Sequence, residues 1–167
     1  MSLDVFMEKW IDFLNKDEEL KRRLKGFKGF CGKPGPRAER AKMLGWPRDM
    51  GVACYPHPGK SMLDGRDLVE LSIEANTYTI RLENGKFDLR KGKSENPCLR
   101  VKMPLPLFRD TLLSRHRWLW ALADDQVKVE CDNSLPHSDW ITIFEVLVCA
   151  QELLEMDIEM RRSVRGW

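Results

Sequence analysis

Between Leu68 and Asp132 the chain alternates apolar and polar residues in short runs. Four such runs stand at residues 69–75, 77–83, 86–90 and 99–103. Alternation with a period of two is typical of strands with one buried and one solvated face. The Asn84-Gly85 dipeptide between the second and third runs favours a two-residue hairpin turn. The pattern predicts four consecutive antiparallel strands, a meander, with one apolar face that must be covered.

Apolar residues at helical spacing predict the covering elements. The first is an amphipathic helix over 3–14, and a second short helix is expected over 16–24. After the four strands, 104–113 predicts a helix whose prolines are acceptable at its first turn, and 115–123 predicts another.

A fifth strand and a long helix are expected in the last third of the chain. Over 126–131 the alternation places Val127, Val129 and Cys131 inward. A helix is then expected from an N-cap at Ser138 to about residue 161, and its first half is apolar almost all the way round. Such a helix is expected to be buried on more than one side.

The chain of 167 residues is most simply one domain. Residues 1–25 hold the first helices, 26–67 form a Pro/Gly-rich basic excursion, and 68–160 hold the sheet with its covering helices. The excursion has no periodicity, although a short helix over 37–44 and a brief strand over 51–54 are expected within it. Loops of this length are often lids or binding loops, and a surface excursion without a role is the alternative.

The amino-acid composition narrows the class of protein to which the chain can belong. Apolar residues make up 43% and charged residues 32%, which excludes wholesale disorder. The five cysteines form no CxxC pair, and no signal peptide is seen, so free thiols in a reducing cytoplasm are expected. The most apolar segment, 140–154, is interrupted by acids and is too short to span a bilayer.

Charge is unevenly distributed although the net charge is only +2. Residues 21–60 contain eleven Lys/Arg and two acids, so this segment would attract an anionic headgroup or a membrane surface. No nucleic acid is expected, because the basic residues share no periodic face and match no RNA- or DNA-binding motif. A basic interaction module is an alternative function.

Catalytic and metal-binding motifs are absent from the sequence. Cys54 and His57, with Cys31 upstream, match no zinc spacing, and Cys54 has no evident orienting group as a nucleophile. We therefore expect no cofactor, no metal and no enzymatic activity. The alternative is an enzyme, or an enzyme accessory, that uses the 26–67 segment over the mouth of a pocket.

The helices predicted to cover the sheet carry more large apolar residues than a thin layer needs. The excess indicates either a well-filled core or an apolar cavity, and the pattern alone leaves both open. The residues of this excess are Phe108, Leu112, Trp118, Trp120, Trp140 and Phe144, to which Met103 of the fourth predicted strand is added.

The order of these elements resembles the sterol carrier protein 2 family. The stretches TYTIRLENGKFDLRKGKSENPCLRVKMPLPLFRDTLL and WALADDQVKVECDNSLPHSDWITIFEVL are similar to its hairpin and to its closing strand and helix. Asp124-Asp125 and Cys131 stand where the family usually has glycines. The resemblance covers about residues 68–155.

The resemblance implies an α/β (α+β) fold, in which a five-stranded, mainly antiparallel sheet has one face covered by helices. It also implies a non-enzymatic apolar pocket between sheet and helices for a hydrophobic small molecule or lipid, such as a sterol, fatty acid, acyl-CoA or phospholipid, which the protein would carry or transfer. The implied ligand-binding residues are Met103, Phe108, Leu112, Trp118, Leu122, Trp140, Phe144, Leu147 and Val148.

Overall fold

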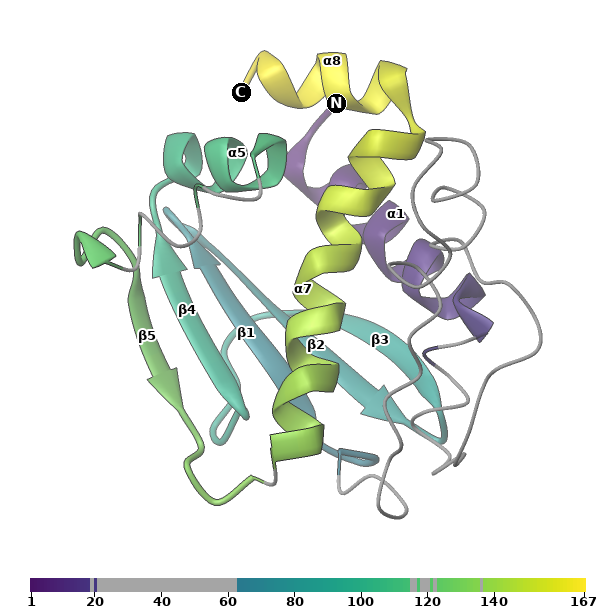
Figure 1. Cartoon of the computed structure of the whole chain (residues 1–167), viewed down its shortest axis with the longest axis vertical. Helices are drawn as coiled ribbons and strands as arrows, with labels where there is room; N and C mark the ends of the chain where they lie inside the picture. The colour runs from purple at the N-terminus through teal and green to yellow at the C-terminus, as the bar shows by residue number, and fades with distance from the viewer. Residues whose placement is uncertain (19, 21–62, 115–116, 118–120, 122, 136) are drawn as a thin grey trace.

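The computed structural model describes residues 1–18, 20, 63–114, 117, 121, 123–135 and 137–167. Its elements follow one another in the order drawn in Figure 1. They are α1 (Leu3–Lys16), β1 (Asp67–Ile73), β2 (Asn76–Glu83), β3 (Lys86–Lys91), β4 (Leu99–Met103), α5 (Leu105–Leu113), β5 (Lys128–Cys131), α7 (His137–Met156) and α8 (Ile158–Arg165).

The five strands form one sheet in the order β3-β2-β1-β4-β5. The β1–β2, β2–β3 and β4–β5 pairs are antiparallel, which confirms the mainly antiparallel sheet. The predicted meander is wrong, however, because β4 lies parallel to β1 and does not pair with β3. Alternation fixes the face that each side chain takes, but it says nothing about which strand lies next to which.

Contacts between residues far apart in the chain fit this position of β4. The edge of β3 is already occupied, because the amide of Asn15 on α1 donates to the Phe87 carbonyl at 2.8 Å and accepts from the Phe87 N–H at 2.9 Å. The chain after β3 instead crosses the outer face of the sheet. There the Ser94 N–H donates to Glu70 at 2.7 Å and the Ser94 hydroxyl donates to Asp67 at 2.7 Å. Two acids of β1 thus hold the crossover in place.

The hairpin between β2 and β3 is confirmed. Asn84 has φ of 52° and Gly85 has φ of 72°, the left-handed backbone that a two-residue turn needs at both positions. Asp64 supports the turn by accepting a hydrogen bond from the Gly85 N–H at 3.2 Å.

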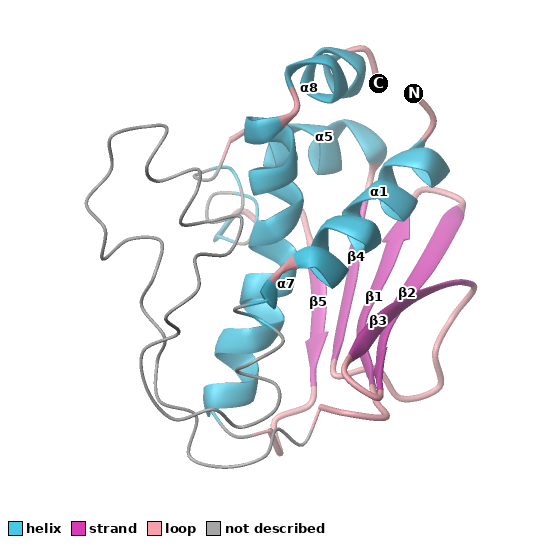
Figure 2. Cartoon of the chain, turned by 90° about the vertical axis from the view of Figure 1, so that its right-hand side faces the viewer, coloured by secondary structure: helices cyan, strands magenta, loops and turns pink. Residues whose placement is uncertain are grey.

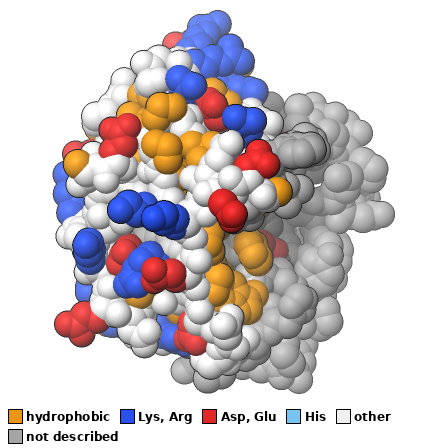
Figure 3. All heavy atoms as spheres, turned by 90° about the vertical axis from the view of Figure 1, so that its left-hand side faces the viewer, with side chains coloured by type: hydrophobic (Ala, Val, Ile, Leu, Met, Phe, Trp, Pro, Cys, Tyr) orange, Lys and Arg blue, Asp and Glu red, His pale blue; other side chains and the backbone are white. Residues whose placement is uncertain are grey.

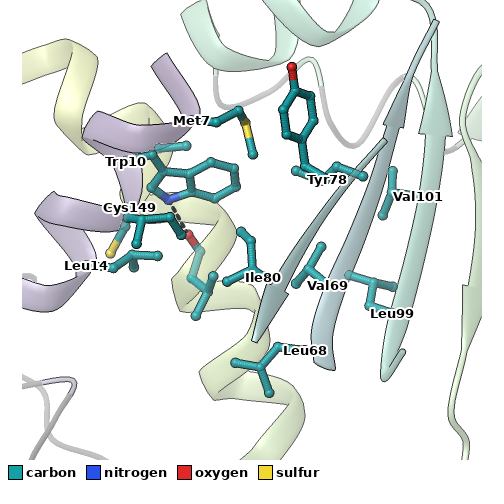
Figure 4. Close-up of a cluster of buried hydrophobic side chains, with 14 of the residues drawn as sticks. Met7, Trp10, Leu14, Leu68, Val69, Tyr78, Ile80, Leu99, Val101 and Cys149 are labelled. Atoms are coloured by element: carbon teal, nitrogen blue, oxygen red, sulfur yellow. Dashed lines mark hydrogen bonds between the residues drawn. The ribbon is translucent and has the colours of Figure 1, made fainter. Parts of the chain in front are cut away.

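The described helices cover one face of the sheet, and a loop crosses the other (Figure 2). Val69, Tyr78, Ile80, Leu99 and Val101 point from the strands toward α1 and α7, as Figure 4 shows. The Trp10 indole of α1 lies among them and donates from Nε1 to the Val146 carbonyl of α7 at 3.1 Å. This hydrogen bond therefore ties the two helices together within the hydrophobic core.

The C-terminal helix predicted as one element is in fact two. α7 ends at Met156, and Asp157 begins α8 by accepting a hydrogen bond from the Met160 N–H at 2.9 Å. A side chain that caps a new helix favours extended backbone at its own position, so the helix breaks there. α5 begins directly after Pro104, as expected from its prolines.

β5 differs from its prediction in the burial of its side chains. Val127, just before the strand, is buried, whereas Val129 and Cys131 are exposed rather than inward in the core. β5 is an edge strand, so its side chains are covered only where a helix reaches that far. The predicted helices over 16–24, 37–44 and 115–123 and the strand over 51–54 lie wholly or mostly outside the described residues.

Candidate functional site

Three of the nine predicted ligand-binding residues lie in the core beside α5. Met103, Phe108 and Leu112 are all buried. The Phe108 ring stacks on Trp167 with the ring centroids 6.4 Å apart and meets Phe6 edge-on at 6.2 Å. These contacts place Phe108 in an aromatic cluster that joins α5 to both ends of the described chain.

Four other predicted residues form a single stripe on α7, named here the outer stripe. They are Trp140, Phe144, Leu147 and Val148. At 100° per residue, their positions fall within one narrow sector of the helix. Phe144 is 55% exposed, the other three are half-buried, and the Trp140 and Phe144 rings lie 6.2 Å apart. The two remaining predicted residues, Trp118 and Leu122, lie outside the described residues.

α7 also has a second apolar stripe, which is the one that packs on the core. Its members are buried at helical spacing: Ile143, Val146, Cys149, Ala150, Leu153 and Leu154. The sequence predicted that this helix, which lacks a wide polar face, would be buried on more than one side. One stripe is buried against described elements, and the outer stripe is partly exposed.

The outer stripe faces the side of α7 on which α5 and β4 lie. Gln151 belongs to the same sector, and its Nε2 donates to the Thr111 carbonyl of α5 at 2.6 Å. α1 lies on the other side of α7, where Trp10 bonds Val146 (Figure 1). The outer stripe is therefore turned toward the part of the sheet that ends in β5.

β5 contributes apolar side chains to the same side. Val129 is directly opposite Val101 and Cys131 directly opposite Leu99, so both belong to the helix-covered face. Val129 is 37% exposed and Cys131 is also exposed. These two are not among the predicted ligand-binding residues, although the alternation of β5 places them on this face.

These two sets of side chains make up the candidate site, named here the α7–β5 surface. It consists of the outer stripe of α7 with Val129 and Cys131 of β5. Figure 3 faces the β5 edge and shows hydrophobic side chains in two groups, one in the upper part of the view and one below its middle. Contiguous exposed apolar surfaces are typical of sites that bind a ligand or a partner.

The end of the surface near the start of α7 is polar. Arg66 donates to Asp132, the residue after β5, at 2.6 Å. Hydrogen bonds from Ser134 and from Arg66 lower the pKa of Asp132 to about 2. A buried thiol lies close by, and burial raises the pKa of Cys98 to about 11, so this thiol is a poor nucleophile at neutral pH.

Among the described residues, little supports a metal site or a reactive cysteine. They hold no group of three or more His, Cys, Asp and Glu placed to bind a metal ion. Burial also raises the pKa of the Cys131 thiol. Cys31, Cys54 and His57, the residues of the predicted alternative site, lie outside the described part of the chain. Among the described helices none is long and apolar enough to cross a membrane.

Comparison with known proteins gives only loose structural likenesses. No family model matches the sequence, and no curated protein matches it. A solved structure described as UbiJ-SCP2, a ubiquinone synthesis protein, aligns with a TM-score of 0.40 and 13% identity over 57% of this chain and 72% of its own.

Two further structures belong to the inverting sec-alkylsulfatase Pisa1 from Pseudomonas sp. The first aligns with a TM-score of 0.38 and 17% identity over 48% of this chain. Its S233Y F250G double mutant aligns with a TM-score of 0.38 and 19% identity over the same share. The chain spans 12% of the length of either sulfatase chain. Likeness at this level is too loose to carry an argument about function.

Proposed function

We propose that the protein binds a hydrophobic ligand, without catalysis, against the α7–β5 surface between the sheet and its helices. The observation that carries the proposal is the outer stripe of α7. A helix already buried along one stripe exposes a second apolar stripe, with the Phe144 ring more than half in solvent. The ligand classes proposed are a sterol, a fatty acid, an acyl-CoA or a phospholipid.

The driving force would be removal of apolar surface from water. About 25 cal/mol is gained per Å² of apolar area buried, so covering ~200 Å² would contribute ~5 kcal/mol before ordering costs. Reversible binding of this size suits a carrier that takes up a ligand and releases it again. The charged pair of Arg66 and Asp132 at one end would orient a polar headgroup.

Ligand content tests the proposal. Native mass spectrometry and lipid extraction of the purified protein are expected to reveal a bound apolar molecule, and a fluorescent fatty acid is expected to bind to the delipidated protein. Protein that carries no such molecule and takes up no fluorescent fatty acid would contradict the proposal.

Two matched variants locate the binding. Phe144→Asp places a charge in the outer stripe and is expected to lower the affinity for the fluorescent fatty acid at least tenfold. Ile158→Asp is the control, because Ile158 is 63% exposed on α8 and lies outside the α7–β5 surface. Both side chains are exposed, so both variants should fold, and equal losses in the two would argue against this location.

A further inference from the structure

The outer face of the sheet carries a second feature, which is electrostatic. Each arginine along this face pairs with an acid on a neighbouring position. The pairs are Arg81 with Asp67 at 3.1 Å, Arg90 with Asp88 at 3.6 Å, and Arg100 with Glu70 at 2.9 Å and with Glu130 at 2.7 Å.

One row across the same face departs from this rule, and we name it the lysine row. The strand registers place its members side by side, since Gly92 bonds Thr77, Thr77 pairs with Ser72, Ser72 with Lys102, and Lys102 with Lys128. In order across the sheet, the row consists of Gly92, which Lys93 follows in the chain, and then Thr77, Ser72, Lys102 and Lys128. Among the described residues, no ion pair joins any of its three lysines to an acid.

The lysine row is unfavourable as it stands. Lys102 and Lys128 are exposed and lie directly opposite each other on β4 and β5. Like charges at directly opposed positions destabilise a strand pair, and no described acid lies within ion-pair distance of either lysine. A local rule broken without a compensating contact is a common mark of a functional site.

The centre of the lysine row provides hydrogen-bonding groups and space. The Ser72 and Thr77 hydroxyls lie 3.2 Å apart and bond each other. Thr77 and Lys93 also line an open pocket of about 430 Å³ at this end of the sheet, which Tyr78 and Lys91 line from the helix-covered side. Strands lie about 4.8 Å apart, so Lys102 stands roughly 10 Å from Thr77, and a long lysine side chain can reach the space between.

We propose that the lysine row binds a phosphate group, held over the Ser72–Thr77 hydroxyl pair between Lys93 and Lys102. A phosphate offers several acceptor oxygens and up to two negative charges, which suit ammonium groups on both sides and hydroxyl donors below. Lys128 adds a third positive charge to the row. The site is on the opposite face of the sheet from the α7–β5 surface, so it does not depend on the hydrophobic ligand.

NMR titration of the full chain tests the site and distinguishes two sources of phosphate. Pyrophosphate represents a soluble phosphorylated molecule, and vesicles containing phosphatidic acid represent a lipid headgroup, with phosphatidylcholine vesicles as the blank. Amide resonances of Ser72, Thr77 and Gly92 are expected to shift on addition of one of these probes, and the affinity should fall as salt is raised. No shift with either probe, or shifts confined to other parts of the chain, would overturn the proposal.

Three variants separate binding from structure. Lys102→Ala is expected to weaken binding at least fivefold, and Lys86→Ala, which removes an outer-face lysine opposite Glu83, should leave it unchanged. Lys102→Glu should abolish phosphate binding while raising Tm by about 1–3 °C, because it places opposite charges across β4 and β5. Unchanged binding in Lys102→Ala would overturn the proposal.

Discussion

The two edges of the sheet are built differently, although helices lie over the same face at both. At the β3 edge, α1 packs closely, Phe87 is buried and Asn15 satisfies the backbone of the edge strand. At the β5 edge, Val129 and Cys131 of the same apolar face are exposed, and the outer stripe of α7 is partly exposed as well. One edge is fixed by packing, and the other offers apolar surface that a ligand can cover.

The largest expected difference between the two edges is in the cost of removing a side chain. Trp10→Ala should lower the free energy of unfolding by about 3–5 kcal/mol, because it empties a fully buried site and removes the bond to Val146. Val129→Ala should cost below about 1 kcal/mol, since Val129 is partly exposed. Urea unfolding of both variants measures the contrast, and similar losses would remove the distinction between the edges.

A smaller effect is expected where α1 meets β3. Asn15→Ala should lower the free energy of unfolding by about 1–2 kcal/mol, because two hydrogen bonds to Phe87 are lost at once. Hydrogen exchange of the Phe87 amide should also become faster. Asp12→Ala is the control, because Asp12 is an exposed residue of α1. Asn84 would be a poor control, because its backbone has the left-handed conformation that its turn requires. If the Phe87 amide is still protected from hydrogen exchange in Asn15→Ala, α1 covers this edge without the two hydrogen bonds of Asn15.

The smallest effect is a pH dependence at the β5 edge. The pKa of Asp132 is lowered to about 2 in the folded protein, whereas an aspartate in an unfolded chain titrates near 4. A lowered folded-state pKa means that the carboxylate stabilises the fold above about pH 4, and that this contribution is lost as pH falls toward about 2.

Asp132→Asn removes this contribution. Unfolding curves recorded between pH 2 and pH 7 should show the variant less stable than the wild type at neutral pH, with the difference narrowing through the acid range. Asp88→Asn, at an exposed position of β3, provides the comparison. A constant difference across the acid range would show that the Arg66–Asp132 contact acts through its geometry and not through its charge.

The sequence predicted the strands, the hairpin and the covered face because these follow from alternation and from Asn84-Gly85. It could not predict that β4 pairs with β1, because that depends on contacts far apart in the chain, such as Ser94 with Glu70 and Asn15 with Phe87. Nor did it predict the break at Asp157, whose capping role depends on a single side-chain contact.

The predicted ligand-binding residues also divide into those whose arrangement follows from the sequence and those whose arrangement does not. Trp140, Phe144, Leu147 and Val148 share one stripe, as helical spacing implies, whereas Phe108 is held in the core by Phe6 and Trp167. The participation of Val129 and Cys131 follows from the incomplete cover of an edge strand, which the alternation of apolar residues does not report. The contacts of all these residues with a ligand remain a prediction.

The most direct test of the central claim uses the exposed thiol of Cys131, with the buried Cys98 and Cys149 as internal references. The alkylation rate of Cys131 is measured by peptide mass spectrometry with and without palmitate, in the wild type and in Phe144→Asp. If a hydrophobic ligand lies on the α7–β5 surface, palmitate should slow alkylation of Cys131 several-fold in the wild type and leave it unchanged in Phe144→Asp. Equal rates with and without palmitate in the wild type, under conditions where palmitate is bound, would contradict the account.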